Sequence, residues 1–240
     1  MSSNERSAGH IGVYLIDDHP AIRDAIRDRI EGLMDMEVCG ETGSSEEAVQ
    51  EIEEIRPEVI VVDISLEDGH GLELIKDLGT RYPDVQSVVF SMYDEKIYAE
   101  RALRAGASGY LMKSDATDAL VEAIRSANEG NVYLSKKMTS RILGKVGRQT
   151  GEGPSFPIDE LTDREMSVFQ MLGQGYSIEE IQDRLSLARK TVETYRRRAK
   201  DKLGFDTVSE LLRYAVQWTY GQGTDQEEDE TAGPPVPARQ

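Results

Sequence analysis

The stretch Val59-Ile60-Val61-Val62-Asp63 is the starting point for assigning a fold to this chain. Four consecutive β-branched residues after Pro57 are typical of a strand that is buried on both faces, as in a parallel sheet. Open sheets of this class bind their ligands at the carboxyl ends of the strands, which is where Asp63 falls. By itself, Asp63 is as easily a cap for the next turn as a functional residue. The residues at the ends of the other strands are therefore needed to distinguish the two interpretations.

Strands and helices alternate on both sides of this stretch. Further strands are predicted over residues 11–16, 36–40, 86–91 and 108–113. Apolar residues at helical spacing follow each strand, and the helices are predicted over 20–34, 44–56, 71–78, 94–105 and 115–128. This alternation with short connections predicts an α/β domain, a (βα)5 flavodoxin-like doubly wound sheet that occupies residues 10–130.

The composition narrows the class of protein. The chain has 240 residues and a formal net charge of -17, which argues against a uniformly basic nucleic-acid coat but leaves room for a local basic patch. Its single cysteine, Cys39, excludes an intrachain disulfide framework and an all-cysteine zinc site. The N-terminus lacks the apolar core of a signal peptide, and no apolar run approaches the roughly 20 residues of a membrane helix. These features predict a cytoplasmic protein with no membrane partner.

The pattern changes after residue 130. One helix over 135–146 and a glycine-rich stretch indicate a partly helical linker over 131–157. Only helices are predicted over 158–220, where a short helix, a tight turn and a longer helix form a helix-turn-helix pattern. The acidic segment 221–240 is expected to be disordered.

Residues with matching chemistry stand at the predicted strand ends: Asp17 and Asp18 at the first, Asp63 at the third, Ser91 at the fourth and Lys113 at the fifth. Each alone has an ordinary explanation as a helix cap, a turn residue or a solvated lysine. Their consistent order favours a site. Clustered carboxylates repel one another and imply a compensating cation, and an all-oxygen site with open positions suits Mg²⁺. Such a metal lets a phosphoryl group approach a carboxylate nucleophile, while Lys113 and Ser91 bind further phosphoryl oxygens.

Residues 10–130, with these motifs, resemble the receiver domain of bacterial two-component response regulators. The resemblance implies that a sensor histidine kinase, or a small phosphodonor, phosphorylates an aspartate in the presence of Mg²⁺. It also implies that a hydroxyl and an aromatic side chain then move inward. In this sequence the family's phosphoacceptor corresponds to Asp63. Its metal ligands correspond to Asp17, Asp18, Asp63 and the carbonyl of Ser65. Its switch and phosphoryl-binding residues correspond to Ser91, Tyr110 and Lys113.

One segment of the predicted helix-turn-helix is positively charged, although the chain as a whole is negatively charged. Between Ile181 and Gly204 eight positive residues stand against three acidic ones. A basic face on the longer helix of a helix-turn-helix is typical of phosphate contact, and the alternative is a solvated face on an ordinary helical bundle. Helical spacing places Val192, Tyr195, Ala199 and Leu203 toward the core. The remaining candidates for DNA contact on this helix include Lys190, Glu193, Thr194, Arg197, Arg198 and Lys200.

Residues 158–220 resemble the NarL/FixJ-type, LuxR-like DNA-binding domain, through the motifs at 161–165, 175–181 and 190–195. The resemblance implies a homodimer when active, and two-fold pairing implies a palindromic site on double-stranded DNA. It places base reading on Glu193, Thr194 and Arg197, phosphate contact on Lys190 and Thr191, and the dimer surface on Val208, Leu212 and Ala215.

The two halves together predict a phosphorylation-controlled transcription regulator that catalyses only its own phosphorylation and dephosphorylation. A Mg²⁺-dependent phosphohydrolase is a rival from another class, but it leaves the basic helix-turn-helix unexplained. A second rival is a regulator that works without phosphorylation, in which the first domain serves as a protein-binding module. The complete acidic set favours the phosphorylated regulator.

Overall fold

A computed structural model describes residues 10–66, 68–115, 117–148 and 157–221. The chain divides into two compact units, residues 1–150 and 151–240. The predicted acidic tail, apart from Gly221, lies outside the described residues, as does most of the glycine-rich part of the predicted linker. Among the helices that the structure describes, none is long and apolar enough to cross a membrane.

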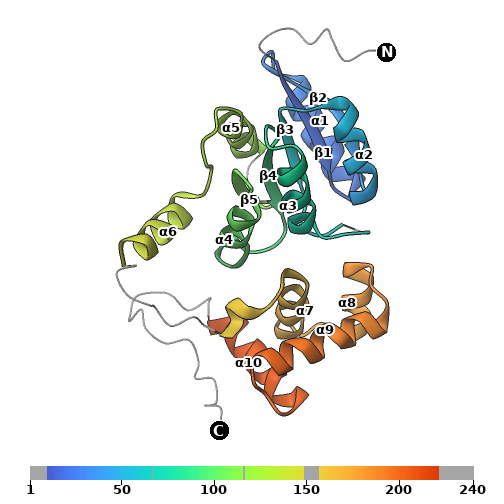
Figure 1. The fold of residues 1–240 in the computed structure, drawn as a ribbon, viewed down its shortest axis with the longest axis vertical. Helices are drawn as coiled ribbons and strands as arrows, with labels where there is room; N and C mark the ends of the chain where they lie inside the picture. Colours follow the sequence, from blue (N-terminus) through green and yellow to red (C-terminus); the bar gives the residue numbers. More distant parts are fainter. Residues whose placement is uncertain (1–9, 67, 116, 149–156, 222–240) are drawn as a thin grey trace. The chain divides into compact units, whose positions relative to one another are not determined.

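The first unit is built on a five-stranded parallel sheet with the strand order β2-β1-β3-β4-β5 (Figure 1). The strands are β1 (Ile11–Ile16), β2 (Met36–Thr42), β3 (Val59–Val62), β4 (Gln86–Ser91) and β5 (Gly109–Met112). The direction in which successive strands are added to the sheet reverses between β1 and β3. The chain that follows β1 therefore crosses one face of the sheet, and the chain that follows β3 crosses the other. This reversal opens a crevice at their carboxyl ends. The predicted (βα)5 sheet is confirmed.

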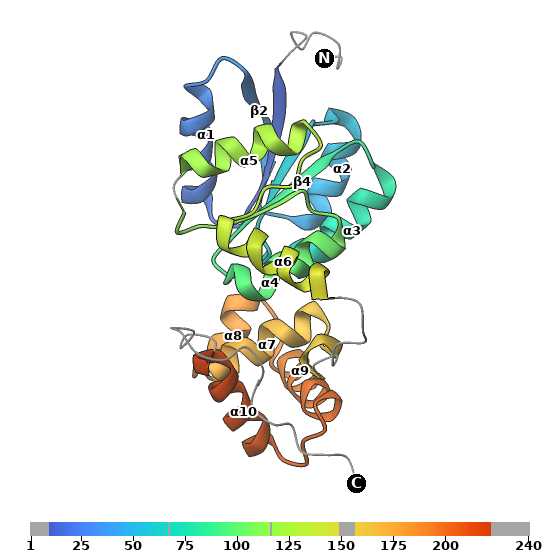
Figure 2. The same cartoon turned by 90° about the vertical axis from the view of Figure 1, so that its left-hand side faces the viewer.

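Helices cover both faces of the sheet (Figure 2). Helices α1 (Pro20–Glu31) and α5 (Thr117–Asn128) pack on one face, and α2 (Ser45–Ile55), α3 (Gly71–Arg81) and α4 (Glu95–Ala105) pack on the other. Every residue of β1 and β3 is buried, which explains their uninterrupted apolar sequences. Helix α1 ends at Glu31, three residues before the predicted end at Met34, and α3 runs three residues past the predicted end at Leu78.

The loop after β3 is tied to the start of α2. Ser44 caps α2 as predicted, since its hydroxyl accepts from the Glu47 N–H (3.2 Å), but the reciprocal half of the expected capping box is absent from the described contacts. The Glu47 carboxylate instead accepts from the Thr42 hydroxyl at 2.6 Å. Asp68 completes the cap, because its carboxylate accepts from the Ser45 N–H (2.8 Å) and from the Ser44 hydroxyl (2.6 Å). The segment that follows Asp63 is thereby held against α2.

The first unit continues past residue 130. Tyr133 lies beside the edge strand β5, where its carbonyl accepts from the Tyr110 N–H (3.1 Å) and its N–H donates to the Ser108 carbonyl (2.9 Å). Helix α6 (Lys136–Arg148) then packs on α4, with Met138 buried and the Ser135 hydroxyl donating to Glu95 at 2.8 Å. These contacts cover an edge that would otherwise expose unpaired backbone groups.

The second unit is helical as predicted. Over the described residues 157–221 it contains a short 3-10 turn (Pro157–Glu160) and four helices: α7 (Asp163–Gly173), α8 (Ile178–Leu185), α9 (Arg189–Lys202) and α10 (Val208–Gly221). The capping boxes predicted at Thr162 and Ser177 are both formed. The turn from α8 to α9 passes through Ser186 in a left-handed conformation (φ 48°). The predicted helix-turn-helix is therefore α8, this turn and α9.

Candidate functional site

Three strand ends bring charged side chains together in the first unit. Asp17 follows β1, Asp63 follows β3 and Lys113 follows β5, and the Asp63 N–H donates to the Ile16 carbonyl at 2.9 Å, which aligns the first two ends. The Lys113 ammonium lies 2.6 Å from Asp17 Oδ2 and 2.6 Å from Asp63 Oδ2. All three side chains are almost fully buried. The structure thus joins residues that are separated by about a hundred positions in sequence.

The charges of this group do not balance. Burial raises the pKa of Asp63, and the neighbouring Asp17 raises it further, against the opposing effect of Lys113. Burial acts to lower the pKa of Lys113, but Asp63 and Asp17 outweigh that effect and the pKa is raised. Lys113 therefore stays charged and serves two carboxylates at once. Two carboxylates thus share a single ammonium group, and the raised pKa of Asp63 means that its buried charge is only partly compensated, which favours the binding of a further cation.

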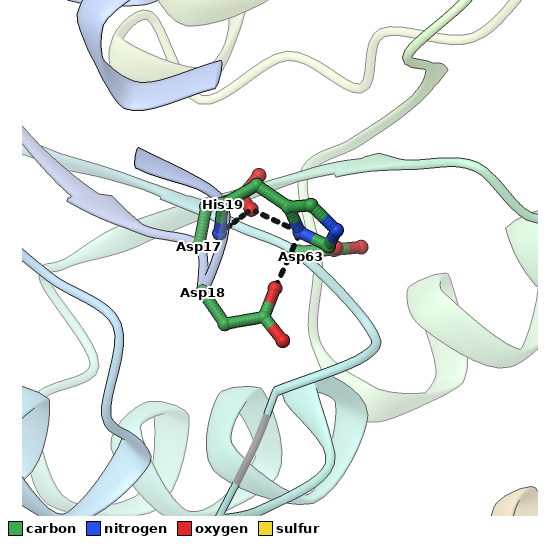
Figure 3. A group of neighbouring side chains, drawn as sticks. All are labelled: Asp17, Asp18, His19 and Asp63. Carbon is green, nitrogen blue, oxygen red and sulfur yellow. Dashed lines mark hydrogen bonds and ion pairs between the residues drawn. The ribbon is translucent and has the colours of Figure 1, made fainter. Parts of the chain in front are cut away.

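A cation has a suitable set of ligand atoms here. Asp17, Asp18, His19 and Asp63 each offer one ligand atom, and these atoms all lie within 4.8 Å of one another (Figure 3). Within the described part of the chain, Asp18 Oδ1 and Asp63 Oδ1 are buried and lack a hydrogen bond of normal geometry, although Asp18 Oδ1 lies 2.5 Å from His19 Nδ1. Buried carboxylate oxygens normally have partners, so these two fit a divalent metal ion. Ser65 lies two residues beyond Asp63, and its role as a ligand stays a prediction.

The two predicted switch residues are both buried. Ser91 ends β4, and its hydroxyl lies close enough to the Asp63 carboxyl group to oppose the rise in its pKa, although no hydrogen bond of normal geometry is formed among the described residues. Tyr110 lies in β5, and its hydroxyl donates to the Tyr93 carbonyl at 2.8 Å. The ring of Tyr110 is buried.

In the second unit, α9 has the predicted division between a buried and an exposed face. Val192, Ala199 and Leu203 are buried, and Tyr195 is half-buried. On the opposite side lie three exposed positive side chains, those of Lys190, Arg197 and Arg198, and the half-exposed Thr191, Glu193 and Thr194. This arrangement gives the helix an exposed basic surface suited to phosphate contact.

Three residues assigned to DNA have side-chain partners within the protein. The Thr194 hydroxyl donates to the Lys190 carbonyl at 2.8 Å. Glu193 accepts from Arg189 at 3.1 Å, and the same guanidinium also contacts Glu179 of α8. Lys200 donates to the backbone carbonyls of Phe205 (3.1 Å) and Asp206 (3.3 Å), which stabilises the C-terminal end of α9. Lys200 thus has a structural task that its sequence position did not indicate.

The predicted dimer surface needs one correction. Val208 and Leu212 of α10 are partly exposed, but Ala215 is fully buried. A Cβ atom on Gly173 of α7 would lie 2.5 Å from the Ala215 carbonyl oxygen, which shows how closely α7 and α10 cross at this point. The prediction of Ala215 as a surface residue is therefore wrong. Val216, at 41% exposed, is the neighbouring apolar residue that faces outward.

Comparison with known proteins accounts for both units. Residues 13–125 match the response regulator receiver domain, and residues 159–215 match the bacterial regulatory proteins of the luxR family. The chain is 32% identical over 207 residues to the DNA-binding transcriptional activator DevR/DosR of Mycobacterium tuberculosis, and the match covers 86% of this chain and 94% of that protein. The chain belongs to the NarL/FixJ family of two-component response regulators. The resemblance stated from sequence is confirmed.

Other response regulators give the same result. The transcriptional regulatory protein DegU of Brevibacillus brevis is 32% identical over 198 residues, which cover 77% of this chain and 84% of DegU. RcsB of Salmonella enterica serovar Typhimurium, solved bound to a promoter, has a TM-score of 0.58 at 24% identity and covers 87% of this chain and 99% of RcsB. At that identity the likeness shows the fold alone. This response regulator thus combines a receiver domain with a LuxR-type helix-turn-helix domain.

Proposed function

We propose that this response regulator is phosphorylated on Asp63 by a sensor histidine kinase, and that phosphorylation controls dimerisation and DNA binding by α9. The observation that carries the proposal is the state of the Asp63 carboxylate. Its Oδ2 atom is held by Lys113 at 2.6 Å, whereas Oδ1 is buried and has no hydrogen bond to the described residues. One oxygen is therefore anchored while the other is available as a nucleophile.

The chemistry is a phosphoryl transfer. Asp63 Oδ1 attacks the phosphorus of a phosphohistidine, and the P–N bond breaks as the P–O bond forms. The imidazole leaves with the bonding electron pair and takes up a proton. Lys113 is placed to share its charge with a new phosphoryl oxygen, and the Ser91 hydroxyl can donate to another. Mg²⁺, held by Asp17, Asp18, Asp63 and the Ser65 carbonyl, would supply the positive charge that lets two anionic groups approach.

The DNA half of the proposal rests on the exposed cations of α9. Lys190, Arg197 and Arg198 have exposed side chains in a chain whose net charge is -17. The N-terminal part of a recognition helix reaches the base edges in the major groove, which assigns base reading to Glu193, Thr194 and Arg197. Pairing of two copies through Val208 and Leu212 would match a palindromic site on double-stranded DNA.

The proposed function gives each part of the chain a role. Residues 10–130 receive the phosphoryl group, 131–157 link the domains, 158–220 bind DNA, and 221–240 form an acidic tail. The receiver would catalyse only its own phosphorylation and dephosphorylation. The contacts of Tyr133 with Tyr110 and of Ser135 with Glu95 connect the start of the linker to β5 and α4, the elements next to the switch residues.

The test is incubation of the full chain with acetyl phosphate and Mg²⁺, followed by intact-mass analysis. The wild-type protein should gain one phosphoryl group, and Asp63→Asn should gain none. Asp68→Asn is the matched control, because this carboxylate lies in the same loop but caps α2, and it should still be phosphorylated. Equal phosphorylation of the wild-type protein and Asp63→Asn would remove the proposal.

A further inference from the structure

We propose that His19 is a nitrogen ligand of the metal site, and that it makes the site bind first-row transition-metal dications, such as Mn²⁺ and Co²⁺, more tightly relative to Mg²⁺ than an all-oxygen site would. The inference rests on the proposed function in one respect, namely that Asp17, Asp18 and Asp63 hold a metal. It assigns a ligand outside that acidic set, and it concerns which ion the site prefers.

The backbone fixes His19 beside the acidic pair. Its N–H donates to Asp17 Oδ1 at 2.9 Å, and the next residue, Pro20, begins α1. A proline in the first turn restricts the backbone at this junction, so the imidazole leaves from a defined position. Its Nδ1 atom lies 2.5 Å from Asp18 Oδ1 and 3.2 Å from Asp17 Oδ1. Figure 3 shows the ring turned toward both carboxylates.

The carboxylates divide their oxygens between two cationic positions. Asp17 and Asp63 both present Oδ2 to Lys113. On the other side of the group, Asp17 Oδ1 and Asp18 Oδ1 approach the imidazole, and Asp63 Oδ1 has no hydrogen bond to the described residues. One position is thus occupied by an ammonium group. The oxygens left over, together with His19, form the second position.

The spacing of these atoms is compatible with ligands of one ion. His19 Nδ1 lies at ion-pair distance, 2.5 Å, from Asp18 Oδ1, so the imidazole already stands beside the carboxylates that would share the ion. Adjacent ligands of an octahedral ion with bonds near 2.1 Å lie about 3 Å apart, and opposite ligands about 4 Å apart. The observed separations of 2.5 and 3.2 Å and the upper limit of 4.8 Å are close to these values.

A nitrogen ligand changes metal preference in a known direction. Mg²⁺ prefers oxygen ligands and retains water, so it gains little from an imidazole. Affinity for a nitrogen-containing site rises from Mn²⁺ through Co²⁺ to Ni²⁺ and Cu²⁺. Removal of His19 should therefore weaken the binding of Co²⁺ much more than that of Mg²⁺. The side chain is 63% exposed, so its removal leaves the core intact.

The experiment compares full-length wild-type protein, His19→Ala and His10→Ala, all without a polyhistidine tag. His10→Ala is the matched control, since it removes another imidazole that lies outside the group. Calorimetric titrations with Mg²⁺ and with Co²⁺ give the two affinities. Pulsed electron paramagnetic resonance of bound Mn²⁺ reports a coordinated imidazole directly, through modulation of the signal by ¹⁴N.

For His19→Ala we expect Co²⁺ affinity to fall by about tenfold or more and Mg²⁺ affinity by less than about twofold, with loss of the ¹⁴N signal. His10→Ala should match the wild-type protein. Equal losses for Co²⁺ and Mg²⁺, or a wild-type Mn²⁺ signal without ¹⁴N modulation, would overturn the role of His19 as a ligand. In that case Mg²⁺ binding that depends on Asp63 would still stand, which separates this failure from failure of the proposed function.

Discussion

Replacement of Asp63 by asparagine should stabilise the receiver domain when no metal is bound. Asp63 is buried, and its raised pKa means that the folded domain disfavours the charged carboxylate. For an acid with a raised folded pKa, stability is highest below the unfolded value near 4 and is lost as the pH rises through the folded pKa. At pH 7 the wild-type protein is above the unfolded value, so it has lost part of the stability that it has at pH 3. The neutral asparagine side chain of the variant carries no charge and avoids this loss.

The size of the effect follows from the geometry. The ligand atoms of Asp17 and Asp63 lie within 4.8 Å of each other, and two like charges at that separation repel by about 3.5 kcal/mol at an effective dielectric constant of 20. The substitution also turns the charged acceptor of Lys113 into a neutral one, which costs about 1–2 kcal/mol. Lys113 keeps Asp17 as a partner at 2.6 Å, so it is not left uncompensated. We expect a net gain of about 2 kcal/mol in the free energy of unfolding.

The chain contains its own reference for the assay. Trp218 is its only tryptophan and packs against Phe169 in the second unit, with ring centroids 5.7 Å apart. Urea unfolding followed by far-ultraviolet circular dichroism reports both units, and tryptophan fluorescence reports the second one. In chelator at pH 7, the receiver transition should move to higher urea in Asp63→Asn while the fluorescence transition stays in place. Added Mg²⁺ should stabilise the wild-type receiver and have a smaller effect on the variant.

The control is Asp24→Asn, which removes one negative charge from the exposed surface of α1 and should change stability only slightly. At pH 3 the advantage of Asp63→Asn should disappear, because the wild-type carboxyl group is then protonated. A receiver that is less stable in Asp63→Asn than in the wild-type protein, in chelator at pH 7, would refute the argument. It would mean that the ion pair with Lys113 outweighs the repulsion and the burial together.

Three further predictions concern other parts of the molecule. Gly40→Ala should destabilise the receiver by about 1–3 kcal/mol in urea unfolding, because a Cβ atom there would lie 2.6 Å from the buried ring of Tyr14. Glu165→Ala should lower the free energy of unfolding of the second unit by about 2–3 kcal/mol, seen as a tryptophan fluorescence transition at lower urea. The reason is that this buried carboxylate accepts from Lys202 at 2.6 Å and completes the cap of α7, and an unchanged transition would contradict that role. Arg197→Ala should weaken binding to the preferred DNA site by about 1–3 kcal/mol and relax base preference, as measured by gel-shift titration. Unchanged binding to every duplex would mean that another face of α9 contacts DNA.

Much of this structure could be predicted from the sequence because it follows from local rules. Uninterrupted apolar runs distinguish the strands from the helices, which repeat their apolar residues every 3.6 positions, and short connections between them favour a parallel sheet. In such a sheet the carboxyl ends of the strands share one edge, so Asp17, Asp63 and Lys113 had to lie near one another. The capping boxes at Thr162 and Ser177 are equally local, since each needs only two residues three positions apart.

The roles of individual side chains were decided by tertiary structure. Ala215 follows the apolar spacing of α10, yet the close crossing of α7 at Gly173 buries it completely. Lys200 belongs to the basic helix, yet the chain turns back after Gly204 and presents carbonyls to it. Hydrogen bonds and close packing depend on where distant backbone segments lie to within about an ångström, which periodicity in the sequence does not specify.

Some features of the acidic site follow from the sequence, and others depend on the tertiary structure. The sequence by itself determined which carboxylates meet, because their positions at strand ends follow from the topology of the sheet. Only the tertiary structure decided that Lys113 takes one oxygen from each of Asp17 and Asp63, and that His19 turns toward the oxygens on the other side. The physical reason is that a carboxylate has two acceptor atoms about 2 Å apart. Which of them faces which cation depends on side-chain torsions that are set by packing in the folded chain.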